Sequence, residues 1–515
     1  MMRHARSLAL VLLAACSGSM KVNRAPSAEH AYAPASRMAV EAGPASAGAI
    51  AAEPGSTAGD THVSHGVNPW VETSRDALST FAADVDTASF TYARRTLLGG
   101  ALPPPASVRV EEFVNYFKYG FPQPQPGSPF SVVMDAAPSP LSPKHHILRV
   151  GIATPTKSAA DRKTANLVFL VDVSGSMHSA DKLGLAKQAL GILVGQLRES
   201  DTVSLVTYAG ATRVVLPATS VEQRPKILAA IDQLSASGST SMGTGLDLAY
   251  DQAMKSMRPG TISRVIVLSD GDTNVGPTSH QAILDIIGSR VKAGVTLSTI
   301  GFGMGNYRAD LMEQLGDRGN GNNYYIDSLD AAKQLFTSNL VSVLEVAAKD
   351  AKLQVELDPA MVARYRLLGY ENRDIKDADF RKDSVDAGEI GAGHQVTAIY
   401  EVQLTEHAAA KPGPLGMVRI RHKAPDGHAA TESTFAMTGA PAGSFDAASA
   451  DFKFAFTVAS FADQLRGAED AQGWSLDRME TVARATAGDD AARRELVGLI
   501  TKARALRGTP TTVAR

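Results

Sequence analysis

Three oxygen-bearing side chains follow an apolar run in the segment NLVFLVDVSGSM. Asp172, Ser174 and Ser176 come directly after the apolar residues 167–171. An unbroken apolar run with β-branched residues is typical of a strand that is buried on both faces. A tight turn at Gly175 can direct alternate side chains into one crevice. The segment therefore predicts a group of oxygen ligands at the carboxyl end of a core strand.

Two further oxygen-bearing loops are expected at the same edge of the sheet. The loop GSTSMGTG contains Thr240, and in VIVLSDGDTN an apolar run ends in Asp270 as the first run ends in Asp172. Two carboxylates and three hydroxyls suit a small hard dication such as Mg²⁺, which takes roughly six oxygen ligands in octahedral geometry. We therefore predict a Mg²⁺ site, with Mn²⁺ or Ca²⁺ as alternatives, whose ligands are Asp172, Ser174, Ser176, Thr240 and Asp270.

The elements that must position these side chains alternate between strand and helix from residue 165 to about 340. Such alternation predicts an α/β domain, here residues 165–345, with a doubly wound, mostly parallel sheet. Ligands of such sheets bind beyond the carboxyl ends of the strands. Strand-like pieces on both sides, at roughly 129–154 and 350–440, indicate that this Rossmann-like domain is inserted in a β-rich accessory domain.

Helices are expected before and after this region. Asp86 can cap a helix that runs to Leu98, and Ser107 can cap an amphipathic helix that ends at Gly120. We expect an N-terminal helical segment with accessory strands at 68–154. We also expect a C-terminal accessory domain at 350–515, which is β-rich over 350–440 and helical over 451–510.

The first residues are typical of a secretory signal. A basic start, a short apolar stretch and small residues precede Cys16, and the apolar stretch is too short to span a bilayer. Cys16 is the only cysteine, so no internal disulfide can form. Residues 17–67 are mostly Ala, Ser, Gly and Pro and predict a disordered linker, to which we assign His62 and His65.

Composition argues against two classes of partner. The chain has 51 Lys+Arg and 53 Asp+Glu without a strongly basic block, so nucleic acid is not expected. No Gly-x-x-x-x-Gly-Lys-Ser/Thr loop occurs, so no nucleotide is expected either. The segment GFGMGN, 301–306, partly matches a dinucleotide fingerprint, but Asn306 takes the place of the third glycine, and we interpret it as a turn.

Several motifs resemble known families. LAAC at 13–16 resembles the bacterial lipoprotein signal, which implies that Cys16 is lipidated and that the protein is extracytoplasmic and anchored at the cell envelope. Ser17 after the cysteine resembles the sorting signal for the outer membrane. The alternative is a plain cleaved signal. DVSGSM, GST and LSDG resemble the metal-ion-dependent adhesion site (MIDAS) of von Willebrand factor type A (VWA) domains. The sequences that flank the α/β region, STFAADVDTASFTYARRTLLGGALPPPASVRVEEFVNYF at 79–117 and the stretch from YRLLGYENR to HQVTAIYEVQL at 365–404, are similar to those of bacterial YfbK-type proteins.

The resemblance implies a binding protein rather than an enzyme. In such domains the metal accepts an Asp or Glu of a protein partner, so we expect a membrane-tethered, Mg²⁺-dependent adhesion or scaffolding protein. Two alternatives stay open. One is a metal-dependent hydrolase of envelope polymers, for which no catalytic base is visible; the other is a structural assembly factor whose accessory regions matter more than the ion.

Overall fold

The computed structural model describes residues 59–239, 241–271 and 280–508. The signal segment with Cys16, the linker up to residue 58 and Thr240 lie outside the described residues. Among the helices that are described, none combines the length and the apolar character needed to cross a bilayer.

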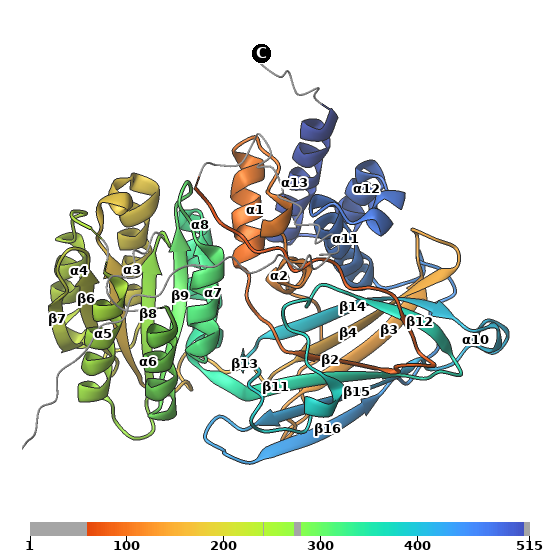
Figure 1. Ribbon diagram of the computed structural model, residues 1–515, viewed down its shortest axis with the longest axis horizontal. Coiled ribbons are helices and arrows are strands. Elements are labelled where there is room, and N and C mark those ends of the chain that lie inside the picture. Colours follow the sequence, from red (N-terminus) through yellow and green to blue (C-terminus); the bar gives the residue numbers. More distant parts are fainter. Residues whose placement is uncertain (1–58, 240, 272–279, 509–515) are drawn as a thin grey trace, which may run out of the picture. The chain divides into compact units, whose positions relative to one another are not determined.

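A six-stranded sheet forms the α/β domain (Figure 1). Its strand order is β10-β9-β8-β5-β6-β7; neighbours pair in parallel except β7, which is antiparallel to β6. The strands are β5 (Ala165–Asp172), β6 (Thr202–Tyr208), β7 (Arg213–Ser220), β8 (Ile262–Ser269), β9 (Val295–Phe302) and β10 (Asn323–Ile326). Every residue of β5 is buried, because it is central and covered on both faces. The predicted doubly wound, mostly parallel sheet is confirmed.

Helices cover both faces of this sheet, and each face has its own hydrophobic core. One core takes side chains from α3 (Leu185–Gln196), α4 (Arg224–Asp232), α8 (Leu329–Lys333) and α9 (Leu340–Leu344). The other takes side chains from α5 (Met242–Ser256), α6 (His280–Lys292) and α7 (Ala309–Arg318).

Strands from before and after the α/β domain form the accessory domain, as predicted. One sheet has the order β1-β12-β14-β4-β3 and a second has the order β13-β11-β15-β16, with β2 also paired to β11. The strands of the first are β1 (Val71–Glu72), β3 (Ser131–Pro138), β4 (His145–Ala153), β12 (Val362–Leu368) and β14 (Gln395–Leu404); those of the second are β2 (Leu78–Ala82), β11 (Val346–Leu357), β13 (Gly388–Gly391), β15 (Gly416–Lys423) and β16 (Ala430–Ala436). Because β4 precedes the insertion and β14 follows it, their antiparallel pairing closes the domain around it.

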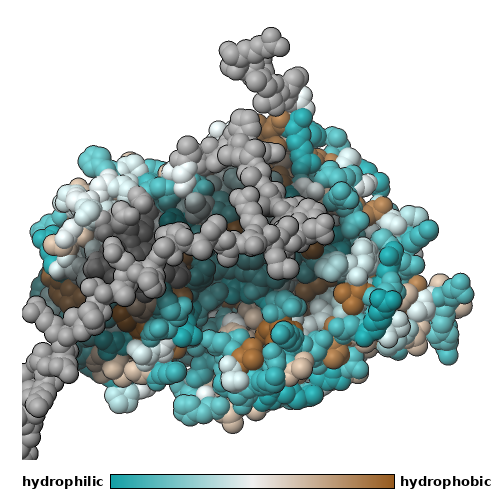
Figure 2. Space-filling view, in the orientation of Figure 1, coloured by the Kyte–Doolittle hydropathy of each residue, from teal (hydrophilic) through white to brown (hydrophobic). Residues whose placement is uncertain are grey.

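The N-terminal and C-terminal helices pack together on the accessory domain. Their common core includes Ile147 of β4 and Ile399 of β14. The helices are α1 (Ala88–Leu98), α2 (Val110–Tyr116), α11 (Ala450–Leu465), α12 (Leu476–Thr486) and α13 (Ala491–Gly508); the short α10 (Glu406–Ala410) follows β14. On the face shown in Figure 2 the described surface is mostly hydrophilic, and hydrophobic residues form small separate groups.

Two predicted helix starts are wrong. Helix α1 begins at Ala88, and Asp86 does not cap it: its Oδ1 accepts the Asn323 N–H of β10 at 2.9 Å. The helix expected from Ser107 is limited to Val110–Tyr116, because Ser107 ends a separate 3-10 turn in which its N–H donates to the Pro104 carbonyl at 2.8 Å; its hydroxyl donates to the same carbonyl at 2.7 Å.

The expected linker extends too far. Residues from 59 onward pack on the α/β domain and on helix α1: the Thr61 N–H donates to the Tyr307 carbonyl at 2.9 Å, and the His62 ring lies edge-on to Tyr92 of α1 with centroids 4.7 Å apart. Burial lowers the pKa of His62 to about 4. The composition of this stretch gave no sign of these contacts, because they use backbone groups and single polar side chains.

Candidate metal centre

The candidate centre lies at the carboxyl ends of the neighbouring strands β5 and β8. These strands are parallel, with Val171 opposite Leu268, so Asp172 and the pair Ser269–Asp270 leave the sheet at the same edge. Both aspartates are completely buried. The two carboxylates predicted as ligands therefore lie in one region, although their positions are 98 apart in the sequence.

Hydrogen bonds fix the Asp172 carboxylate. Its Oδ1 accepts the Ser174 N–H at 2.8 Å, and its Oδ2 accepts the Ser269 hydroxyl at 3.0 Å. Burial raises the pKa of Asp172 to about 6; the hydrogen bonds from Ser174 oppose this shift, and the nearby Asp270 adds to it. The hydroxyls of Ser174 and Ser176 lie 2.9 Å apart. The DVSGSM turn thus places one carboxylate and two hydroxyls together.

The loop that carries Thr240 approaches the same turn. The Gly175 N–H donates to the Gly238 carbonyl at 3.0 Å, and the Ser237 N–H donates to the Val173 carbonyl at 2.7 Å. Thr240 itself lies outside the described residues, so its role stays a prediction.

Three residues at this site were not predicted from the sequence. Ser269 bonds Asp172 as described above, and the Lys182 Nζ lies 3.0 Å from Asp270 Oδ2. The Asn306 amide donates to the same oxygen at 3.2 Å. The only signal for Ser269 was a polar residue ending an apolar run; Lys182 and Asn306 gave none, since they come from a π-helical turn (Ala180–Gly184) and from the loop after β9.

The chemistry of these side chains fits a hard dication. The predicted ligands that are described offer only oxygen, and two buried carboxylates against one lysine leave the site with a formal charge of −1 when both are ionised. Within the described ranges, no group of three or more His, Cys, Asp or Glu side chains is arranged to hold a metal, so the acidic ligands described at this centre are its two aspartates.

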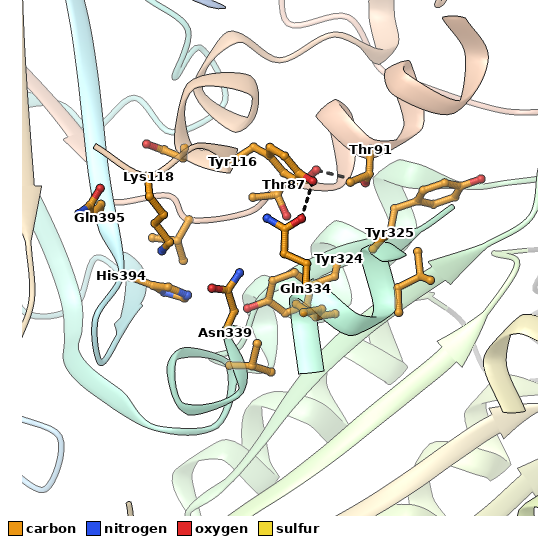
Figure 3. Close-up of a pocket in the computed structure, with 16 residues that line it drawn as sticks. Thr87, Thr91, Tyr116, Lys118, Tyr324, Tyr325, Gln334, Asn339, His394 and Gln395 are labelled. Atoms are coloured by element: carbon orange, nitrogen blue, oxygen red, sulfur yellow. Dashed lines mark hydrogen bonds between the residues drawn. The ribbon is translucent and has the colours of Figure 1, made fainter. Parts of the chain in front are cut away.

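A separate small cavity lies between α1, α2, β10 and the turn before β14 (Figure 3). Its volume is about 50 Å³, and its lining includes Lys118 and His394 but neither Asp172 nor Asp270. Tyr116 donates a hydrogen bond to Gln334 across it at 2.8 Å. This cavity therefore brings no histidine to the candidate metal centre, and it lends no support to the hydrolase alternative.

His394 should make the protein acid-sensitive. Burial, followed by the nearby Lys118 and Arg264, lowers the pKa of His394 to about 3, and its Nδ1 accepts the Gly391 N–H at 3.1 Å. The unfolded chain therefore binds a proton below pH 6.5 that the folded chain does not bind until about pH 3, so stability falls with pH in that window. Between pH 7 and pH 5, the free energy of unfolding should fall by about 2 kcal/mol more in wild type than in His394→Gln.

Urea unfolding at a series of pH values measures this difference. The exposed His428 supplies the control, because His428→Gln should follow wild type. Parallel pH profiles of wild type and His394→Gln would contradict the assignment.

Comparisons with known proteins place the three regions of the chain in known families. The family model "von Willebrand factor type A domain" matches residues 166–338, "von Willebrand factor" matches 57–149, and "Uncharacterized protein YfbK, C-terminal" matches 342–506. The uncharacterized protein YfbK of Escherichia coli (strain K12) is 38% identical over 460 residues, which cover 84% of this chain and 79% of that protein.

More distant matches have lower sequence identity. Inter-alpha-trypsin inhibitor heavy chain H4 of Sus scrofa is 28% identical over 144 residues, 27% of this chain and 16% of that protein. A solved structure, the von Willebrand factor type A protein from Catenulispora acidiphila, is 15% identical with a TM-score of 0.43 and covers 75% of this chain and 97% of that chain.

Proposed function

Because this chain belongs to the YfbK family of proteins with a von Willebrand factor type A domain, we propose that it binds a protein partner through a divalent metal. Domains of this type commonly bind metal and protein partners. The observation that carries the proposal is the pair of buried carboxylates, Asp172 and Asp270, at adjacent strand ends beside two serine hydroxyls.

Each residue of the centre has a part in this proposal. Asp172 and Asp270 supply the negative charge that attracts the ion, and Ser174 and Ser176 supply neutral oxygens. Thr240, in the adjoining loop, is proposed as the fifth ligand. A bound Mg²⁺ would supply a positive charge that accepts an Asp or Glu of the partner.

We propose further that this binding takes place at the cell envelope. A lipidated Cys16 and the linker after it would tether the described domains to a membrane, with the outer membrane favoured by Ser17. The lipoprotein-like segment LAAC supports this part of the proposal.

Capture of the partner should depend on both the metal and Asp172. The full chain is mixed with envelope extract and then cross-linked. Wild type should capture partners when Mg²⁺ is present during the cross-linking, should not capture them when EDTA is present instead, and should capture them again when Mg²⁺ is restored before cross-linking. Asp172→Asn should capture none of these partners even with Mg²⁺, since it lacks one of the two charges that hold the ion. Quantitative mass spectrometry of the captured proteins measures both effects.

The same assay decides between the proposal and its alternatives. Partners that remain with EDTA and with Asp172→Asn would contradict metal-bridged binding and favour an assembly factor that acts through its accessory domain. Mg²⁺-dependent release of fragments from purified envelope polymers, lost in Asp172→Asn, would favour the hydrolase.

A further inference from the structure

A lysine ammonium lies on one of the two carboxylates of the candidate metal centre. The Lys182 Nζ is 3.0 Å from Asp270 Oδ2 and 2.7 Å from Asn306 Oδ1, and the Asn306 amide donates to the same Asp270 oxygen at 3.2 Å. Only 10% of the Lys182 side chain is exposed. The three groups form a closed arrangement inside the protein, unlike a surface lysine that samples many positions.

The backbone makes room for this lysine. Gly303, in the loop after β9, has φ +73, and a Cβ at this position would lie 2.3 Å from Lys182 Cγ. Both the positive φ and the close approach favour glycine. A larger residue at position 303 would force the stem of Lys182 to shift, so the glycine leaves room for this stem on its way to Asp270.

The N-terminal segment anchors the loop that carries Asn306. Asp60 Oδ1 accepts the N–H groups of Gly305 and Tyr307 at 2.8 and 2.7 Å, and the Tyr92 hydroxyl donates to Asp60 Oδ2 at 2.8 Å. The residues on both sides of Asn306 are thus fixed by one carboxylate. This arrangement holds Asn306 where its side chain can contact both Lys182 and Asp270.

We infer that Lys182 is a built-in competitor of the divalent ion and sets the metal affinity of the centre through Asp270. This inference rests on the proposed metal-dependent function. Ionised Asp172 and Asp270 carry a formal charge of −2, which Lys182 reduces to −1. A divalent ion that binds Asp270 must share its carboxylate with the ammonium group or displace it, and both cost affinity.

Titration of the full chain with Mg²⁺ alone, by isothermal calorimetry, tests the inference. Lys182→Met and Lys182→Gln both remove the charge, and Gln keeps a hydrogen-bond donor in case Met impairs folding. Each should bind Mg²⁺ about tenfold more tightly than wild type, the lower end of what one adjacent charge does to an ionic site. Lys187→Met is the matched control, because Lys187 lies on α3 and donates to the carbonyls of Asp232 and Leu234; its affinity should equal that of wild type.

The outcomes separate this inference from the proposed function. If wild type binds Mg²⁺ and the folded Lys182 variants bind it no more tightly than wild type, the competitor role is overturned and the metal-dependent function is left intact. Unfolding of both variants would also overturn it and make Lys182 a structural residue. Absence of Mg²⁺ binding in wild type and in folded Lys182 variants would instead remove the proposed function itself.

Discussion

Asp172→Asn should abolish the stabilisation of the protein by Mg²⁺ without unfolding it. At a Mg²⁺ concentration one hundred times the dissociation constant, wild type should gain about 2.7 kcal/mol in free energy of unfolding, whereas the variant should gain none. The variant should still fold, because Asn keeps one oxygen for the Ser174 N–H and places its amide near the Ser269 hydroxyl. It also removes the repulsion by Asp270 that helps to raise the pKa of Asp172.

Thermal unfolding with and without Mg²⁺ measures this effect. Asp330→Asn is the control within the same domain, because the Asp330 side chain is 90% exposed and pairs with Lys333 at the surface; it should keep the full Mg²⁺ response. A Mg²⁺ response in Asp172→Asn as large as that of wild type would show that the ion binds elsewhere.

Arg373→Met should lower the free energy of unfolding by about 3–5 kcal/mol. Four carboxylates surround the Arg373 guanidinium: Asp84 at 3.0 Å, Asp86 at 3.2 Å, Glu313 at 3.3 Å and Asp317 at 2.7 Å. Met would leave buried charges without their counter-ion. Burial raises the pKa of Asp86 well above its usual value and also raises the pKa of Glu313, so the deficit in free energy of unfolding should shrink at lower pH as these two carboxylates become neutral.

Chemical unfolding at pH 7.5 and pH 5.5 tests both parts of this prediction. Arg381→Met is the control, because Arg381 pairs with Glu432 at the surface and its side chain is 65% exposed; its midpoint should stay close to that of wild type. If Arg373→Met lowers the free energy of unfolding only slightly, and equally at both pH values, Arg373 does not join α7 to Asp84, Asp86 and the accessory domain.

The strands of the α/β domain could be predicted because their signals are local. Apolar runs such as 167–171 fix the central strands, and their ends place Asp172 and Asp270 at one edge once the sheet is parallel. The accessory domain could be predicted more coarsely, since strand-like pieces flank the insertion on both sides. Which strands pair, such as β4 with β14, depends on contacts between residues far apart in the sequence.

The surroundings of the site could not be predicted, for a different reason. Lys182 and Asn306 reach Asp270 from a π-helical turn and from the loop after β9; the course of both segments depends on packing, and neither has a periodic pattern. Likewise Asp86 looked like a helix cap because aspartate often is one, but a long-range bond to the Asn323 N–H satisfies it instead. Single polar contacts across the fold carry no signal in the spacing of residues.

The most direct test of the metal centre is anomalous diffraction from crystals of the full chain soaked in Mn²⁺, which prefers oxygen ligands as Mg²⁺ does and scatters anomalously. We predict an anomalous peak at the carboxyl ends of β5 and β8, in contact with Asp172 or Asp270 and with the serine hydroxyls of the DVSGSM turn. A Mn²⁺ peak found only at other positions, with Asp270 still paired to Lys182, would contradict the account.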